Sequence, residues 1–138
     1  MRRFCRFCQR ESGEGIISGL YVMFVLAIVL FVAVEVASYS MSAWKLYGAC
    51  GEIMDMMKGE NGLDGAMEHR FRELLAALNL GDLGIRLEGT PKTVQRGDLL
   101  ELRARGRYPI KGLRPLGREL SVSISVTLRG LAHTYVRR

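Results

Sequence analysis

The sequence predicts an α+β fold in which a long N-terminal transmembrane helix continues into a small domain with a second helix and a three- to four-stranded antiparallel sheet. Three observations lead to this prediction. Residues 16–34 carry no charge, the apolar residues after them recur at helical spacing, and the apolar residues after Gly84 alternate with polar ones. With 138 residues, of which 49% are apolar, the chain is long enough for one small domain and an anchor.

The uncharged segment from Ile16 to Val34 gives a helix that rises about 28 Å, close to the thickness of the hydrocarbon core of a bilayer. Four arginines precede it, whereas Lys45 is the first cation after it. The positive-inside rule therefore predicts a single-pass protein with a cytoplasmic N-terminus and an external C-terminal domain. A secretory signal cleaved after Ser38 is the competing interpretation. Glu35 is interpreted as the end of the span, with a polar contact to a neighbouring helix as the alternative.

An apolar stripe continues along the same helix, with spacings that alternate between three and four residues. Its members are Val36, Tyr39, Ala43, Leu46, Cys50, Ile53 and Met57. The stripe is either packed on the chain's own domain or an assembly seam that packs on identical or related helices. Gly48 and Gly51 weaken a helix by about 1 kcal/mol each relative to Ala, but they also permit close helix–helix approach.

The predicted organisation has a cytoplasmic arginine-rich tail over residues 1–15, a long helix over 16–58 and an extracytoplasmic α+β domain over 59–138. In this domain Asp64 is the expected N-cap of a second helix, which ends before Gly81. The apolar residues of the second helix are Met67, Phe71, Leu74, Leu75 and Leu78. Alternating patterns predict strands over residues 85–88, 99–108 and 120–128, with a short fourth strand over 131–136. One apolar sheet face results, and the two helices are expected to cover it.

Charge is distributed unevenly: residues 1–44 carry +1, residues 45–80 carry −2 and residues 81–138 carry +7, which sum to the net charge of +6. Within the basic part, Arg103, Arg105 and Arg107 point to one side of a strand, about 7 Å apart. They are a solvated face, a contact for a partner such as the acidic segment of another subunit, or a contact for a polyanion such as DNA or a cell-wall polymer. No aromatic residue is interleaved on that side, so nucleic acid is the least favoured ligand.

Patterns typical of enzymes are not found in the sequence. His69 and His133 are the only histidines, neither stands in HExxH, and no GxSxG motif occurs. Cys5 and Cys8 form half of a zinc site at most, or a site of lipidation. Cys50 is expected to be a buried small apolar residue, with an intermolecular disulfide as the alternative. The sequence therefore predicts no catalytic residue, no metal site and no cofactor.

The layout resembles that of a known family. A short arginine-rich leader with Gly-Glu-Gly at residues 13–15 precedes an apolar helix that continues beyond the membrane, and a small antiparallel sheet ends the chain. The link YPIKGLRPLG and the segment GRELSVSISVTLRGLAHTYVRR look like the final hairpin of that family. These features are similar to type IV pilin-like proteins, and most closely to the TadE-like minor pilins of tight-adherence (Tad) systems and their Gram-positive relatives.

This resemblance implies a structural minor pilin or pseudopilin of a bacterial Tad/type IV-type pilus or secretion apparatus at the cell surface, assembling through its N-terminal helix. The implied partners are the membrane, other pilin-like subunits or copies of the same chain, a prepilin peptidase and secretion machinery. Peptidases of this class cut after a Gly, which places the cut between Gly15 and Ile16. The family usually has a Glu five residues into the mature helix, where this chain has Leu20, so an uncleaved tail is the alternative.

Two other functions remain open from the sequence. One is a single-pass membrane protein whose basic external domain binds a protein partner or a polyanion without forming a filament. The other is an external domain that is released by cleavage after Ser38.

Overall fold

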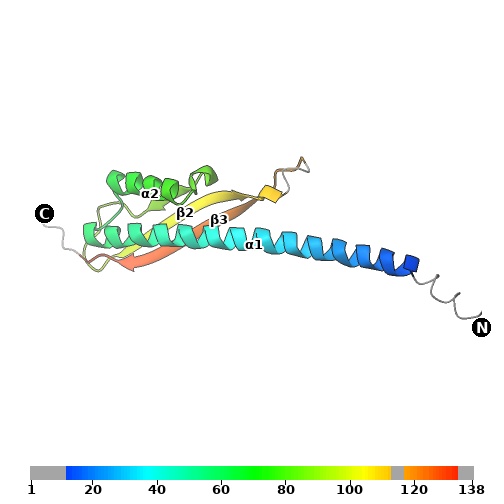
Figure 1. Cartoon of the computed structure of the whole chain (residues 1–138). Helices are drawn as coiled ribbons and strands as arrows, with labels where there is room; N and C mark the ends of the chain where they lie inside the picture. Colours follow the sequence, from blue (N-terminus) through cyan, green and yellow to red (C-terminus); the bar gives the residue numbers. More distant parts are fainter. Residues whose placement is uncertain (1–11, 113–116, 134–138) are drawn as a thin grey trace, which may run out of the picture. The chain divides into compact units, whose positions relative to one another are not determined.

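The computed structural model describes residues 12–112 and 117–133, which form two helices, a short 3-10 helix and one sheet. The elements follow the order α1 (Ser12–Glu60), α2 (Gly65–Ala77), η1 (Gly81–Leu83), β1 (Arg86–Gly89), β2 (Leu99–Pro109) and β3 (Ser121–Leu131) (Figure 1). The chain divides into two compact units, Met1–Ala37 and Ser38–Arg138. This is the α+β fold that the sequence predicts.

Helix α1 contributes to both units. Its large apolar side chains from Ile16 to Val34 are exposed, and the helix is long and apolar enough to cross a membrane. It begins at Ser12, earlier than the predicted start at residue 16, and ends at Glu60. Asn61 then adopts a left-handed conformation (φ 60°), and the N–H of Gly62 donates to the carbonyl of Met57. The helix is therefore ended by an Asn in the position that Gly usually takes.

Helix α2 begins as predicted, because the Asp64 carboxylate accepts a hydrogen bond from the N–H of Gly65. Its end differs from the prediction. Asn79 is left-handed (φ 57°), and the N–H of Leu80 donates to the carbonyl of Leu75, as in a Schellman motif. Gly81 instead opens η1, so the Asn and not the Gly terminates the helix.

The sheet is an antiparallel meander in the order β1-β2-β3. Ala104 of β2 lies opposite Leu87 of β1 and Val126 of β3, so the apolar residues of all three strands share one face. The predicted face of β2 is confirmed, since Leu100, Leu102, Ala104 and Tyr108 are all buried. The predicted fourth strand is not seen among the described residues: Leu131 belongs to β3, and residues 134–136 lie outside the described part of the chain.

The core of the second unit lies between the sheet and the helices. Side chains from the last third of α1, from α2 and from the inner face of β2 and β3 form one apolar cluster. In Figure 1, β2 and β3 run beside this part of α1. An added Cβ at Gly130 of β3 would lie 3.2 Å from the sulfur of Met54, which shows how closely α1 approaches the strand. The helices therefore cover the apolar sheet face, as predicted, and leave the arginine-bearing face open.

A glycine is required where two loops cross. Gly62 has φ 142°, and a Cβ at this position would lie 2.5 Å from the backbone of Lys92. Here Leu63 forms a single parallel bridge with Pro91, and its N–H donates to the carbonyl of Thr90. The connection after α1 is thereby held against the loop between β1 and β2.

Candidate assembly and anion-binding surfaces

The apolar stripe predicted as an assembly seam divides into two parts. Leu46, Cys50, Ile53 and Met57 are 0% exposed, because the side chains of the sheet and of α2 cover them. These four residues fit the other sequence interpretation, in which the stripe packs on the chain's own domain. No surface of these side chains is left for a second subunit, and the seam interpretation must be corrected for them.

None of the remaining three seam residues is fully buried. Val36 is 59% exposed. Tyr39 and Ala43 are partly buried and pack against the edge of the core. The ring of Tyr39 contacts the ring of Tyr108 edge to face, with the ring centroids 5.6 Å apart. These contacts also belong to the chain itself.

A second stripe on α1, which sequence reasoning missed, has three exposed residues and one half-buried residue, Gly51. Met41, Trp44, Gly48 and Gly51 follow one another at spacings of three, four and three residues, which places them on one side of a helix. The spacing puts this side opposite Leu46, Cys50 and Ile53. Trp44 is 83% exposed and Met41 is 63% exposed. We call these four residues the outer stripe.

The two glycines of the outer stripe have no role in the packing of their own chain. An added Cβ at Gly48 or at Gly51 would meet nothing within 4 Å outside the local helix backbone. Glycine in a helix interior costs about 1 kcal/mol relative to Ala, and here no contact within the domain compensates that cost. The glycines do provide a smooth surface on which another helix can lie close.

The outer face of the sheet carries the arginines predicted from the sequence. Arg103 is paired with Glu101, with 2.7 Å between its Nη2 and the carboxylate Oε1, and Arg129 of β3 lies 3.8 Å from the same oxygen. The hydrogen bond from Arg103 is the main cause that lowers the pKa of Glu101, and the charges of Arg103 and Arg129 add to it. One carboxylate therefore partly neutralises two of the arginines.

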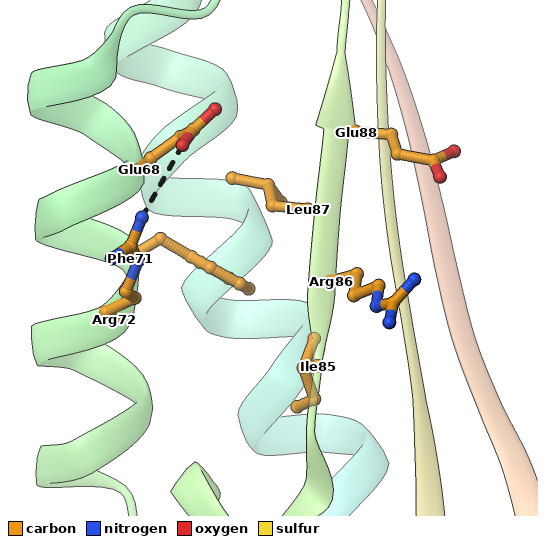
Figure 2. Close-up of a pocket in the computed structure, with 7 residues that line it drawn as sticks. All are labelled: Glu68, Phe71, Arg72, Ile85, Arg86, Leu87 and Glu88. Carbon is orange, nitrogen blue, oxygen red and sulfur yellow. Dashed lines mark ion pairs between the residues drawn. The ribbon is translucent and has the colours of Figure 1, made fainter.

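Arg105 and Arg107 are arranged differently. The strand register places Arg86 of β1 directly opposite Arg105, a pair that the sequence could not reveal. Figure 2 shows Arg86 and Glu88 projecting from β1 away from α2, while Leu87 points toward α2. Arg86, Arg105 and Arg107 line a hollow of about 460 Å³ together with Leu83, Gly84 and Gly106. We call this the arginine hollow. None of the ion pairs among the described residues involves its three arginines.

A second hollow of about 380 Å³ lies between α2 and β1 (Figure 2). Phe71, Ile85 and Leu87 form its apolar wall, and Glu68 and Arg72 form an ion pair of 3.7 Å at its rim. Its lining includes the carboxylates of Glu68 and Glu88 but no His, Cys, Ser or Thr.

The titratable candidates that fall on the described part of the chain are Cys50, His69 and His133. Cys50 is buried, and this burial raises the pKa of its thiol to about 12, so it is an unreactive core residue. His69 is exposed and lies 3.5 Å from Glu73, and His133 is exposed at the end of β3. Among the described residues no group of three potential metal ligands occurs.

The predicted leader falls only partly on the described residues. Gly15 and Ile16 both lie within α1, and Ile16 is exposed. Cys5, Cys8 and the four N-terminal arginines lie outside the described residues. Comparison with protein-family models, with curated proteins and with solved structures found no match to this chain.

Proposed function

We propose that the chain is a structural, pilin-like subunit (a minor pilin or pseudopilin) of a Tad/type IV-type pilus or secretion apparatus, which assembles through its N-terminal helix. The observation that carries this proposal is the outer stripe. It is a largely exposed surface on the same helix as the apolar run from Ile16 to Val34, and it combines Trp44 and Met41 with two glycines beside which the domain leaves open space. The resemblance to TadE-like minor pilins supports the proposal.

The physical logic of such a subunit follows from helix α1. The apolar run keeps the subunit in the bilayer before assembly, with the external domain outside and the tail in the cytoplasm. During assembly, contacts with lipid are exchanged for contacts with neighbouring helices, so the apolar side chains stay covered in both states. The outer stripe extends these helix–helix contacts beyond the membrane.

Cysteine crosslinking of the full chain in membranes tests this proposal. In a chain with Cys5, Cys8 and Cys50 replaced by Ser or Ala, a single cysteine is introduced by Met41→Cys. The matched control is Met56→Cys, which is 39% exposed and lies outside the outer stripe. We expect oxidation to link Met41→Cys subunits to one another, or to pilin-like proteins of the same cell, and to leave Met56→Cys unlinked. Equal linking from both positions would contradict assembly through the outer stripe.

N-terminal sequencing of the mature protein tests the processing step. A chain that starts at Ile16 supports cleavage by a prepilin peptidase. A start at Met1 means that the tail is retained, and the subunit then acts as a membrane-resident component of the apparatus. A start at Tyr39 would contradict the proposal, because it would remove the membrane segment.

A further inference from the structure

The arginine hollow is electrostatically unfavourable as it stands. Arg86 and Arg105 lie directly opposite each other on neighbouring strands, and Arg107 follows on the same side of β2. Like charges placed directly opposite in a sheet destabilise it. Within the described part of the chain no carboxylate forms an ion pair with these three side chains, although Glu101 does so for Arg103 and Arg129 nearby. An external anion would relieve this repulsion.

The backbone around the hollow is shaped by two glycines. Gly84 is left-handed (φ 56°) and turns the chain from η1 into β1. A Cβ at Gly106 would lie 2.7 Å from a side-chain carbon of Ile85 and 3.0 Å from the carbonyl oxygen of Leu83. The glycine therefore lets the segment before β1 lie directly on β2, which brings Arg86 beside Arg105. The recess depends on these residues and is more than a chance grouping of long side chains.

The acidic helices of a second copy are a poor match for this hollow. All six carboxylates of residues 45–80 already form ion pairs within their own chain. These residues are Glu52, Asp55, Glu60, Asp64, Glu68 and Glu73. A subunit contact would have to break such pairs on one side in order to form new ones on the other. The anion is more readily supplied by something other than this chain.

A single-stranded nucleic acid also fits poorly. Such ligands are held by aromatic side chains on which bases stack, together with basic groups that follow the backbone. Tyr108, the aromatic residue of β2, is only 7% exposed and belongs to the core. The exposed residues of this face on β3 are Ser121, Ser123, Ser125, Thr127 and Arg129. The hollow offers guanidinium groups to a phosphate, but it has no aromatic surface on which a base can stack.

The length of the chain places lipid phosphates within reach. Arg107 is next to Tyr108, whose ring contacts Tyr39, and the Tyr39 hydroxyl donates a long hydrogen bond of 3.5 Å to the carbonyl of Ser123. Tyr39 follows Val34 by five residues, and five residues span at most about 18 Å even when fully extended. If Ile16–Val34 spans the bilayer, the length of the connecting chain keeps Tyr39, and with it the Arg107 end of β2, within reach of the headgroups.

We propose that Arg86, Arg105 and Arg107 bind the phosphate of an anionic phospholipid headgroup. The guanidinium groups of arginines form paired hydrogen bonds with phosphate oxygens, and three of them around one recess match the negative charge of such a headgroup. This inference rests on the membrane span of the proposed function. It adds a lipid preference to the membrane-resident stage of the subunit.

The full chain tests this proposal after reconstitution in bilayer nanodiscs that contain equal parts of phosphatidylglycerol and phosphatidylcholine. After mild detergent extraction, the lipid that stays bound to the protein is identified by mass spectrometry. We expect phosphatidylglycerol to be retained in preference to phosphatidylcholine by about fivefold for each arginine that contributes. The double variant Arg86→Gln with Arg105→Gln is expected to lose most of this preference.

The matched control is the double variant Arg103→Gln with Arg129→Gln. It removes the same charge from the same sheet face but leaves the arginine hollow intact, and it is expected to keep the preference. An equal loss in both double variants would overturn the proposal, since it would show only a general effect of charge. Displacement of the lipid by an equal concentration of inorganic phosphate, or by a duplex oligonucleotide, would overturn the assignment to lipid.

The same samples separate this proposal from the proposed function. Release of the wild-type chain from membranes by alkaline carbonate would contradict the membrane span on which both rest. A wild-type chain that stays in the membrane without any preference for phosphatidylglycerol would contradict the lipid site alone. Crosslinking through Met41→Cys would then still report on assembly.

Discussion

Tyr39 of α1 meets Tyr108 of β2 edge to face, with the ring centroids 5.6 Å apart and the ring planes at 86°. At the other end of the same helix segment, Met54 and Lys58 lie over Gly130 of β3. The helix rises about 22 Å from Tyr39 to Met54, which is close to the length of the strand from Ser123 to Gly130. The tyrosine pair therefore closes one end of the contact between the helix and the sheet.

A double-mutant cycle measures this contact. The variants Tyr39→Leu, Tyr108→Leu and their combination keep apolar side chains at both positions but remove the aromatic pair. We expect a coupling energy of about 0.5–1.5 kcal/mol, as for other aromatic pairs. Unfolding of the unit Ser38–Arg138 is followed by amide hydrogen exchange of the full chain in detergent. Additive effects of the two single changes would show that the rings do not interact.

Truncation of a core side chain should lower the stability of the domain, whereas truncation on the outer stripe should weaken assembly. Leu46→Ala or Ile53→Ala is expected to cost about 2–5 kcal/mol of unfolding free energy, because both side chains are 0% exposed. Trp44→Ala is expected to change stability by less than about 0.5 kcal/mol but to weaken assembly. Denaturant unfolding and co-purification with partner subunits measure the two effects. A large loss of stability in Trp44→Ala would mean that this residue packs on its own domain.

Gly48→Ala is expected to affect the stability of the single subunit and the contact between subunits in opposite directions. Since nothing lies within 4 Å of the added methyl group, the isolated subunit should become more stable by about 0.5–1 kcal/mol. The same methyl group is expected to reduce crosslinking through Met41→Cys, because it holds neighbouring helices apart. A gain in stability with unchanged crosslinking would indicate that no helix approaches this position closely.

Glu101→Gln should make the domain less sensitive to acid. The pKa of Glu101 is lowered from its usual value of 4.5, so the unfolded state binds the proton more readily than the folded state. The stability that this group contributes is present above pH 4.5 and is lost as the pH falls through the lower folded-state pKa. In Glu101→Gln, the melting temperature should therefore fall less between neutral and acidic pH. An identical fall in the wild type and the variant would show that the carboxylate is not paired in the folded state.

Cys50 should react with thiol reagents only when the domain unfolds. Its pKa of about 12 leaves almost no thiolate at pH 8, and its side chain is 0% exposed. In a chain with Cys5→Ser and Cys8→Ser, we expect maleimide labelling of Cys50 to be slow and to accelerate with denaturant in parallel with unfolding. Rapid labelling of the folded protein, or a disulfide-linked dimer through Cys50, would show that this residue is exposed to partners.

The fold could be predicted from the sequence where a local pattern determines it. The uncharged run, the Asp64 cap and the alternation in Leu99–Tyr108 each depend on residues close in the chain, and each matches the structure. The ends of the helices were predicted less accurately. Asn61 and Asn79 take the left-handed positions at the two helix ends, since Asn also tolerates this conformation.

The surfaces were harder to predict, for two physical reasons. A spacing of three and four residues shows that a helical stripe is apolar, but it does not show what covers the stripe. The spacing of Leu46 and Ile53 is therefore the same whether they belong to a core or to an assembly seam. The outer stripe around Trp44 was overlooked because its glycines interrupt the apolar pattern. Arg86 could not be joined to Arg105 without the register of the strands, which is a non-local property.

The burial of Leu46, Cys50, Ile53 and Met57 by their own chain has a consequence for the timing of the assembly that we propose. Each copy of the domain completes its core alone, so its melting temperature should not depend on protein concentration, in contrast to an obligate oligomer. Such a subunit can accumulate as a folded monomer before it is assembled. The supply of subunits would then be set by how fast they are recruited, and folding would not need to wait for a neighbour.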